Sequence, residues 1–316
     1  MRLVFFDIEC ASVHKNYAKI CAFGYVVCDE KFNILEKEDI LINPRGRFEL
    51  TDRKGEKGIV LPYEYGEFKK QPSFPSVYKR IKNLLEDKDS VVLGHAVLND
   101  VKYLNLETKR FHLPSFRFSF ADSQLFYMSY KNDYSRQFGL EHIAEDLKVE
   151  FTPHRAVDDA YATMRVVEAM CRENNCDYIQ LTELLGFTNG RIENYNVVRP
   201  QSKGFKKYRL DKKSAKEARS KCRIKFYNNL SRKRFKKGGV LDGKTFTFCR
   251  ALEDDIDISI PLVDKIYELG GKYCQKIDEG EYLVKLDGDD SDRSKRAAKG
   301  GKKILLLEEL QELLNV

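Results

Sequence analysis

Residues 1–10 read MRLVFFDIEC, a short apolar run followed by two acids. The short apolar run at residues 3–6 predicts a buried strand. Asp7 and Glu9 follow at positions i and i+2, so on a strand both carboxylates face the same side. Two neighbouring carboxylates repel each other, and a hard divalent cation such as Mg²⁺ removes that repulsion because it prefers oxygen ligands. The pair suggests a metal site, although such pairs are also common on exposed strands.

Strand and helix patterns alternate on the carboxyl side of this stretch. Residues 20–42 are rich in strand-forming side chains around a turn at Asp29-Glu30, which predicts a hairpin. Further strands are expected at residues 90–94 and 116–120, and helices at residues 77–85, 97–111, 140–147 and 158–171. Residues 44–72 contain Gly, Pro and many charges and predict a loop. An opening hairpin followed by this alternation indicates an α/β fold with a mixed sheet.

Two further motifs carry groups that suit metal chemistry. GHAVLND ends at Asp100, on the helix expected after strand 90–94. Taken alone, Asp100 could be an ordinary surface acid or part of a helix cap. HRAVDD begins at His154, five residues before Asp159 at a helix start. A loop histidine in that place can take a proton from water because its pKa is near neutral. The alternative is an ordinary loop histidine, with Asp158 capping the helix.

The three motifs, in this order and on these elements, resemble those of the DEDDh exonucleases. That superfamily includes the proofreading epsilon subunit of bacterial DNA polymerase III and ribonuclease T. The resemblance covers residues 1–172. It implies a ribonuclease-H-like fold, in which a five-stranded mixed sheet is flanked by helices. It also implies 3′→5′ removal of single nucleotides from a nucleic-acid end, with two Mg²⁺ or Mn²⁺ ions.

The resemblance also implies roles for individual residues. Asp7 would bridge the two ions, Glu9 and Asp159 would complete the site of the ion that activates water, and Asp100 would support the second ion. His154 would be the general base. These roles agree with two-metal chemistry, in which one ion lowers the pKa of the attacking water and the other stabilises the leaving 3′ oxygen.

The residues around the first motif would contact the terminal nucleotide. By the same resemblance, these contacts come from Ile8, Cys10 and Ala11. Many members have Thr-Thr-Gly after the first motif, whereas this chain has Cys10-Ala11-Ser12. Such changes leave the acids intact but alter the pocket walls. The preference for sugar and base therefore stays open.

The net charge of +7 is unevenly distributed along the 316 residues. Residues 177–237 hold 18 Lys and Arg against 5 Asp and Glu, whereas residues 1–176 and 238–316 have net charges of −1 and −5. The basic segment also contains aromatic residues, and part of it has helical spacing. Cations can follow phosphates and aromatic rings can stack on bases, so the segment predicts nucleic-acid binding. The alternative is a solvated linker. The candidate contacts are Lys206, Lys207, Arg232, Lys233 and Arg234.

Residues 238–316 resemble a BRCT domain, a small α/β fold. The stretches that carry the resemblance are VLDGKTFTFCRAL, ELGGKY, EYLV and KGGKKILLLEELQELL. The Trp that is common in the last BRCT helix is absent, and Leu310 could fill its space. Cys249-Arg250 stand where phosphopeptide-binding members have Ser/Thr and Gly. The resemblance implies a replication or repair protein, or DNA, as partner, and the alternative is a structural appendage.

These observations predict three segments: an exonuclease domain at 1–176, a partly helical basic linker at 177–237 and a BRCT-like domain at 238–316. We expect a metal-dependent exonuclease acting on single-stranded 3′ ends of DNA in repair or replication. An RNA 3′-end trimming exonuclease and a non-catalytic scaffold that holds nucleic-acid ends are the alternatives. The complete set of acids argues against the scaffold. The amino terminus does not read as a secretory signal, no membrane helix is expected, and eight cysteines without a CxxC pair predict a cytoplasmic protein.

Overall fold

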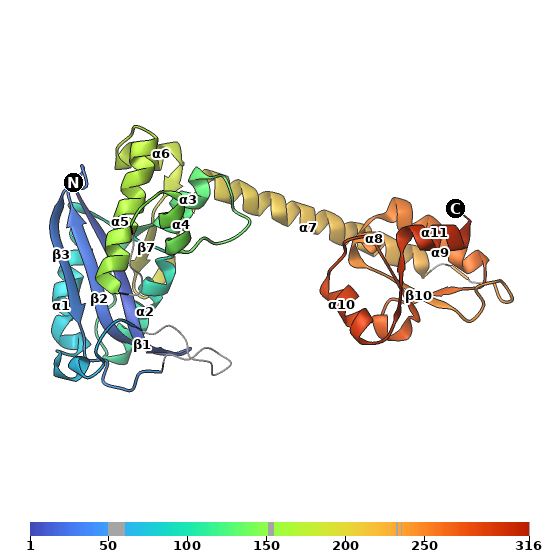
Figure 1. Cartoon of the computed structure of the whole chain (residues 1–316), viewed down its shortest axis with the longest axis horizontal. Helices are drawn as coiled ribbons and strands as arrows, with labels where there is room; N and C mark the ends of the chain where they lie inside the picture. Colours follow the sequence, from blue (N-terminus) through green and yellow to red (C-terminus); the bar gives the residue numbers. More distant parts are fainter. Residues whose placement is uncertain (50–60, 151–154, 232, 235, 316) are drawn as a thin grey trace. The chain divides into compact units, whose positions relative to one another are not determined.

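The computed structural model describes residues 1–49, 61–150, 155–231, 233–234 and 236–315 (Figure 1). The chain forms two compact units, Met1–Arg209 and Leu210–Val316. The point of division lies within helix α7 (Lys203–Leu230). The sequence suggested boundaries after residues 176 and 237, whereas by packing the first unit continues to Arg209.

The first unit is built on one mixed sheet in the strand order β3-β2-β1-β4-β5-β7-β8. β1 pairs antiparallel with β2, and β2 with β3, whereas β4 and β5 run parallel to β1. The strands are β1 (Arg2–Val13), β2 (Ala18–Cys28), β3 (Ile34–Leu41), β4 (Ser90–Gly94), β5 (Phe118–Asp122), β7 (Gly190–Glu193) and β8 (Asn196–Val198). The mixed α/β architecture and the hairpin at residues 20–42 are confirmed.

The sheet has seven strands, whereas five were predicted, because the β7–β8 hairpin extends it beyond β5. β7 pairs antiparallel with β5, and the absence of a side chain at Gly190 lets the backbone lie against the ring of Phe120. A two-residue turn joins the hairpin, and its residues Asn194 and Tyr195 both have positive φ, at 49° and 61°. Such turns match the twist of the paired strands. This stretch lies in the segment that the sequence analysis treated as a basic linker.

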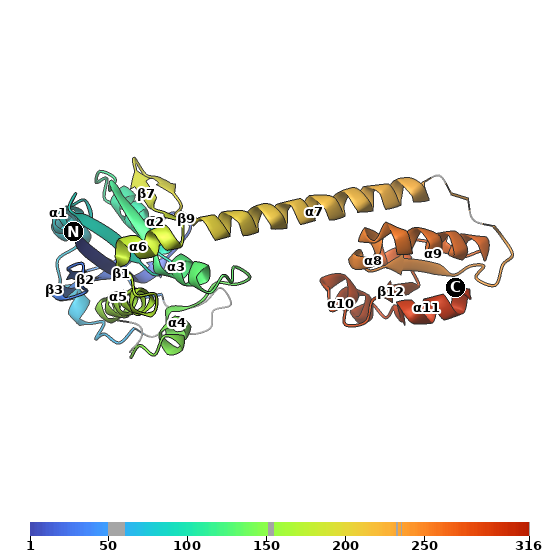
Figure 2. The same cartoon turned by 90° about the horizontal axis from the view of Figure 1, so that it is seen from above.

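Helices cover both faces of this sheet (Figure 2). Side chains of β1 alternate between two apolar cores: Leu3 and Phe5 enter one, and Val4 and Phe6 enter the other. Helix α5 supplies much of the first core, so the odd-numbered positions of β1 face α5. The helices are α1 (Phe74–Leu85), α2 (Leu98–Arg110), α3 (Ser123–Tyr130), α4 (Leu140–Asp146), α5 (Ala156–Glu173) and α6 (Tyr178–Leu184), with a short η1 (Glu67–Lys70). A small ladder joins β6 (Phe187–Thr188) to β9 (Gln201–Ser202).

The second unit contains a parallel sheet in the order β11-β10-β12-β13. Phe226 of α7 is fully buried in its core with Phe246 and Phe248, so the end of the basic helix is part of this unit's fold. Leu310 is buried there too. The elements are β10 (Thr245–Phe248), α8 (Arg250–Asp254), α9 (Ile256–Glu268), β11 (Lys272–Tyr273), η2 (Ile277–Glu279), β12 (Tyr282–Lys285), α10 (Asp292–Lys299), β13 (Lys303–Leu306) and α11 (Leu307–Leu314).

Among the described residues of both units, no helix is both long enough and apolar enough to cross a bilayer.

Candidate active site

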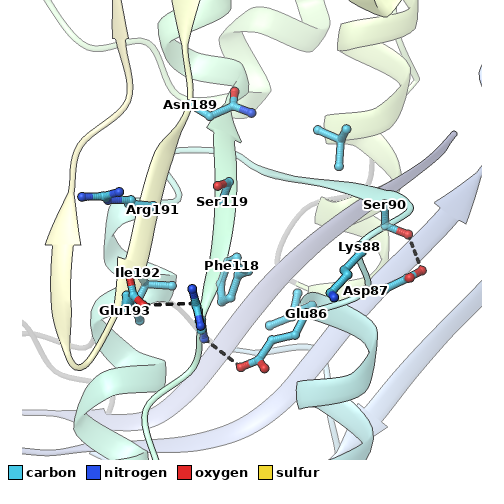
Figure 3. A pocket seen from close by; sticks show the side chains of 13 residues that line it. Glu86, Asp87, Lys88, Ser90, Phe118, Ser119, Asn189, Arg191, Ile192 and Glu193 are labelled. Carbon is cyan, nitrogen blue, oxygen red and sulfur yellow. Dashed lines mark hydrogen bonds and ion pairs between the residues drawn. The ribbon is translucent and has the colours of Figure 1, made fainter.

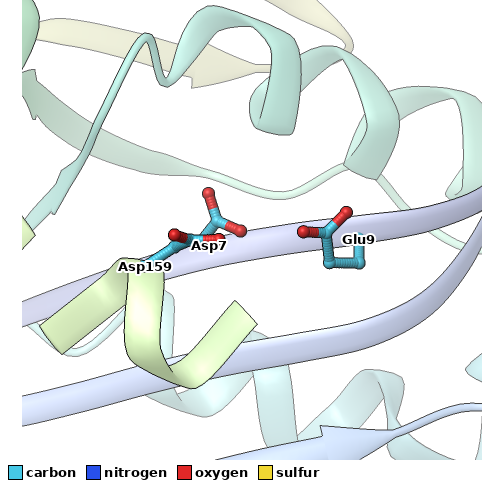
Figure 4. A group of neighbouring side chains, drawn as sticks. All are labelled: Asp7, Glu9 and Asp159. Atoms are coloured by element: carbon cyan, nitrogen blue, oxygen red, sulfur yellow. The ribbon is translucent and has the colours of Figure 1, made fainter. Parts of the chain in front are cut away.

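Three carboxylates from two elements, β1 and α5, meet between these elements (Figure 4). Asp7 and Glu9 come from β1 and Asp159 comes from α5, and one ligand oxygen of each lies within 4.8 Å of the others. Asp7 and Glu9 continue the odd-numbered positions of β1, which face α5. The alternation seen in the sequence therefore places both acids under the helix that carries Asp159.

A glycine in β2 lets α5 come close enough to complete this group. Gly24 pairs with Asp7 across the β1–β2 ladder. A Cβ at Gly24 would lie only 2.0 Å from the backbone nitrogen of Val157 and 2.1 Å from the carbonyl carbon of Ala156. The first turn of α5 thus rests directly on the backbone of β2, next to Asp7. This contact fixes where Asp159 enters the site.

Asp100 is the fourth acid of the site and is buried in the first turn of α2. It does not cap its helix, since the residue at the N-cap position is Val97. Burial raises the pKa of Asp100, and the negative charges of Glu9 and Asp122 add to this effect. Hydrogen bonding to backbone amides, including that of Ile8 in β1, opposes the rise. These interactions place Asp100 beside β1 and remove the surface-acid and helix-cap interpretations.

The charges of the site are costly without a cation. Burial raises the pKa of Asp7 well above its usual range, and the charges of Asp100, Asp159 and Glu9 raise it further. Burial and the charges of Asp159 and Asp39 raise the pKa of Glu9 to about 8. A donor set made only of carboxylate oxygens matches the preference of Mg²⁺ and Mn²⁺. The residues present therefore fit hard divalent cations, which would remove the repulsion.

Asp39 of β3 adds a supporting network that the sequence analysis missed. The Tyr63 hydroxyl donates to Asp39 Oδ2 at 2.9 Å, and Arg155 Nε donates to the same oxygen at 3.1 Å. The amide of Ala156 donates to the Tyr63 hydroxyl at 3.1 Å. The network ties β3 and the segment around Tyr63 to the first residues of α5. Its bonded partners Asp39 and Arg155 lie 116 positions apart, and no local motif joins them.

Asp122 orders the turn that leads into α2. Its Oδ1 accepts from the amides of Ala96 at 3.1 Å and Gln124 at 3.0 Å. Ala96 has a positive φ of 47°, a strained conformation that such bonds help to hold. Burial raises the pKa of Asp122 to about 6, although these amides oppose the rise. Asp122 therefore positions the helix that carries Asp100.

We expect Asp122→Ala to lower exonuclease activity about tenfold to a hundredfold, since small displacements of a reacting group are costly. The variant leaves two amides without their acceptor, which costs about 1–3 kcal/mol of stability for each group that stays buried. Asp122→Asn keeps one acceptor oxygen and should recover part of both losses. Rates on a labelled oligonucleotide and thermal unfolding curves check this. Full activity of Asp122→Ala would contradict the positioning role.

The remaining candidate residues differ in whether the structure describes them and in how far they are buried. His154 and Arg232 lie outside the described residues. The side chains of Ile8 and Ala11 are buried in apolar clusters, so only their backbone is available to a nucleotide, whereas Cys10 is partly exposed.

The basic candidates divide into two kinds. Lys206 and Lys207 are exposed on α7, and Arg234 is exposed as well. Lys233 ion-pairs with Asp264 within the second unit, so its charge is already engaged. The sequence could not separate these cases, because the pairing partner is distant in the chain.

A separate hollow of about 440 Å³ lies at the other end of the parallel strands (Figure 3). It adjoins the first residues of β4 and β5, whereas the acids lie beyond their last residues. Several of its charged groups already have partners: Arg117 Nε pairs with Glu193 at 3.1 Å, and the Ser90 hydroxyl donates to Asp87 at 2.7 Å. The Arg117 amide donates to Glu86 at 2.7 Å. This hollow has neither the acids nor a surplus of charge.

No curated protein matches this chain. Among solved structures, it is similar to a 3′-exonuclease described as recognising the 3′ end of a histone mRNA stem-loop (14% identity, 64% of this chain and 91% of that one, TM-score 0.47). It is also similar to the nuclease domain of 3′hExo, a DEDDh family member bound to rAMP (17% identity, 55% of this chain and 93% of that one, TM-score 0.45). A third similar structure is E. coli exonuclease I with a dA16 oligonucleotide (18% identity, 58% of this chain and 42% of that one, TM-score 0.42).

One protein family matches more than half of the chain. The exonuclease family model (RNase T) matches residues 4–167, just over half of the chain. The match spans the strand with Asp7 and Glu9, the helix with Asp100 and most of α5. The chain therefore belongs to the exonuclease family, which confirms the exonuclease class predicted from its sequence.

Proposed function

We propose that this exonuclease removes nucleotides one at a time from single-stranded 3′ ends of DNA, in repair or replication, with two Mg²⁺ or Mn²⁺ ions. The observation that carries the proposal is the convergence of Asp7, Glu9 and Asp159 with the buried Asp100. Four carboxylates in one partly buried place are unfavourable unless cations occupy it. Their number and their oxygen donors suit a pair of hard cations.

The residues of the site then have distinct roles. We assign Asp7 to both cations, Glu9 and Asp159 to one of them, and Asp100 to the other. Bound cations would activate the attacking water and neutralise charge on the leaving 3′ oxygen. His154, from the sequence motif, is the proposed proton acceptor. The Asp39 network would hold the start of α5, which carries Asp159, in register with β1.

Parallel digestion of DNA and RNA oligonucleotides of one sequence tests the substrate class. We expect DNA to be shortened from its 3′ end faster than RNA under identical conditions with Mg²⁺. Faster shortening of RNA would overturn the DNA assignment and favour the RNA-trimming alternative. Binding of both strands without hydrolysis would favour the scaffold.

Helix α7 supports the assignment of a polyanionic substrate. Of its 28 residues, 11 are Lys or Arg and two are acidic, and Phe226 is its buried residue. A helix that exposes cations along its length is suited to contacts with backbone phosphates. We therefore propose that Lys206 and Lys207, on the part that belongs to the first unit, contact nucleic acid flanking the cut end.

Replacing Lys206 and Lys207 with Gln should weaken DNA binding and flatten its salt dependence. Each lost phosphate contact should reduce the slope of log affinity against log salt by about 0.7 on single strands. Titrations at several salt concentrations measure this slope. A matched control replaces Lys88 and Arg172, which are exposed on the first unit away from α7. Equal slopes for the α7 variant and the control would refute the contact.

For the second unit we propose a BRCT-like module that binds a replication or repair protein. Its four parallel strands with flanking helices support the resemblance. Arg250, where phosphopeptide-binding members have Gly, ion-pairs with the buried Glu253 and donates to the Tyr227 hydroxyl at 2.7 Å. A phosphate would have to compete with these bonds. The proposed partner contact therefore does not use this position. A cytoplasmic location stays a prediction from cysteine use.

A further inference from the structure

A groove of about 850 Å³ lies on the first unit, close to the carboxylates. Part of its wall comes from the start of α2 and from α3, and part from the segment before α4. The remaining wall comes from residues 197–209, beyond the matched family region. The residues that matter here are Leu98, Leu125, Met128, Tyr134, Phe205 and three arginines, Arg136, Arg199 and Arg209.

The groove opens at the same edge of the sheet as the acids. Leu98 lines it from α2, two residues before Asp100. Asp122 also lines it, and Asp122 pairs with Gly94 at the last positions of β5 and β4. The charge of Asp122 reaches Asp100, whose pKa it raises. A nucleic-acid strand whose 3′ end lies at the acids can therefore continue into this groove without leaving the first unit.

The rim of the groove is cationic. Arg136, Arg199 and Arg209 are exposed, and none forms an ion pair with a residue that the structure describes. The lining acid, Asp122, is buried and bonded to two amides. Three arginines without carboxylate partners favour an anionic ligand, and guanidinium groups suit phosphate oxygens in particular.

The floor of the groove is apolar and partly aromatic. Leu125 and Met128 of α3 are buried beneath it, and the rings of Tyr134 and Phe205 lie 5.8 Å apart beside it. The guanidinium carbon of Arg209 is 5.9 Å from the centre of the Phe205 ring. Flat apolar surface next to unpaired cations suits a ligand that alternates bases with phosphates.

We propose that this groove holds the nucleotides of the substrate strand that precede the bond being cut. Backbone phosphates contact Arg136, Arg199 and Arg209, and a base packs against Phe205 and Tyr134. The inference rests on the proposed function and extends it, because it names where the uncut strand lies. Since one wall lies outside residues 4–167, this strand path is a feature of this chain beyond its matched family region.

The test compares a long and a short substrate in the full-length protein. The long one is a single-stranded DNA of ten nucleotides, and the short one is the p-nitrophenyl ester of thymidine 5′-monophosphate, which has no preceding nucleotides. The variant is Arg136→Gln/Arg199→Gln/Arg209→Gln. The control, Lys88→Gln/Arg172→Gln/Arg191→Gln, removes three exposed cations outside the groove that have no ion pair with a described residue.

We expect the ratio of kcat/KM for the long substrate to that for the short one to fall at least about tenfold in the groove variant, mainly through KM. The salt slope for the long substrate should fall by about 2, since each contact with a single strand contributes about 0.7. The control should keep both values.

An unchanged ratio and salt slope in the groove variant would overturn the proposal, as would equal losses on the two substrates. Failure of the proposed function looks different: the unaltered protein would then hydrolyse neither substrate, or Asp7→Ala would hydrolyse both at the unaltered rate.

Discussion

Replacing Asp7 with Asn is expected to reduce hydrolysis by about a thousandfold or more while making the cation-free protein more stable. The substitution keeps the size of the side chain and removes one carboxylate from the centre of the site. Asp7 stands between Glu9, Asp159 and Asp100, so its loss weakens any cation held there. Losing a single group that stabilises charge in the transition state typically costs about a hundredfold to a thousandfold, and here two cations would be affected.

The gain in stability follows from the same geometry. Burial and four neighbouring acids raise the pKa of Asp7, so folding must either bury a repelled charge or protonate the carboxyl group. Asn carries no such cost. Without divalent cations, its unfolding temperature should therefore exceed that of the unaltered protein by several degrees. Adding Mg²⁺ should raise the unfolding temperature of the unaltered protein and have much less effect on Asp7→Asn.

Asp158→Asn is the matched control for this experiment. Asp158 precedes Asp159 on the same helix, but it pairs with Lys37 at 3.5 Å and lies outside the cluster of three acids. Its substitution should leave the rate within about twofold of the unaltered value, as is usual for a surface change of this kind. If Asp7→Asn cut as fast as Asp158→Asn, Asp7 would not belong to the catalytic site.

Replacing Gly24 with Ala should be the most damaging single-methyl change in the first unit. The added Cβ would meet the backbone of Val157 at 2.0 Å, and backbone cannot rotate away as a side chain can. The start of α5 must lift from β2, at a cost of about 3 kcal/mol or more. Asp159 moves with it, so activity should fall by about a hundredfold, as for a displacement of about 1 Å.

Gly139→Ala provides a control with the same chemical change. Gly139 has ordinary extended backbone angles, and no atom lies within 4 Å of the position that its Cβ would take. Thermal unfolding and initial rates of the two variants should therefore diverge sharply. Equal stability of both variants would mean that α5 does not rest on β2, and the proposed placement of Asp159 would fail.

Local patterns in the sequence predicted the four acids and the elements that carry them. Asp7 and Glu9 followed from strand alternation, and the helices predicted at residues 97–111 and 158–171 followed from apolar spacing and the motifs. The family resemblance then joined the three motifs, which single spacings could not do. The acids could be found locally because Asp7 and Glu9 lie two positions apart on one strand, and Asp100 and Asp159 lie in the first turns of their helices.

Features that depend on contacts between distant segments could not be predicted. Asp39 looks like one more acid on the partly exposed strand β3, and its bonds to Tyr63 and Arg155 exist only in the folded chain. The β7–β8 hairpin lies in a segment whose dominant signal was its charge. The groove beside the acids unites residues from four separate segments. In the sequence, Gly24 resembles any other strand residue, and only the folded chain shows that α5 packs against it.

The most direct test of the proposed function is digestion of a 5′-labelled single-stranded DNA with Mg²⁺, compared with the same reaction in EDTA. With Mg²⁺ we expect a ladder of products that shorten by one nucleotide at a time from the 3′ end. In EDTA we expect no shortening, because the four acids then hold no cation to activate the attacking water. Shortening that persists in EDTA, or products cut at internal positions while the 3′ end stays intact, would contradict the proposed function.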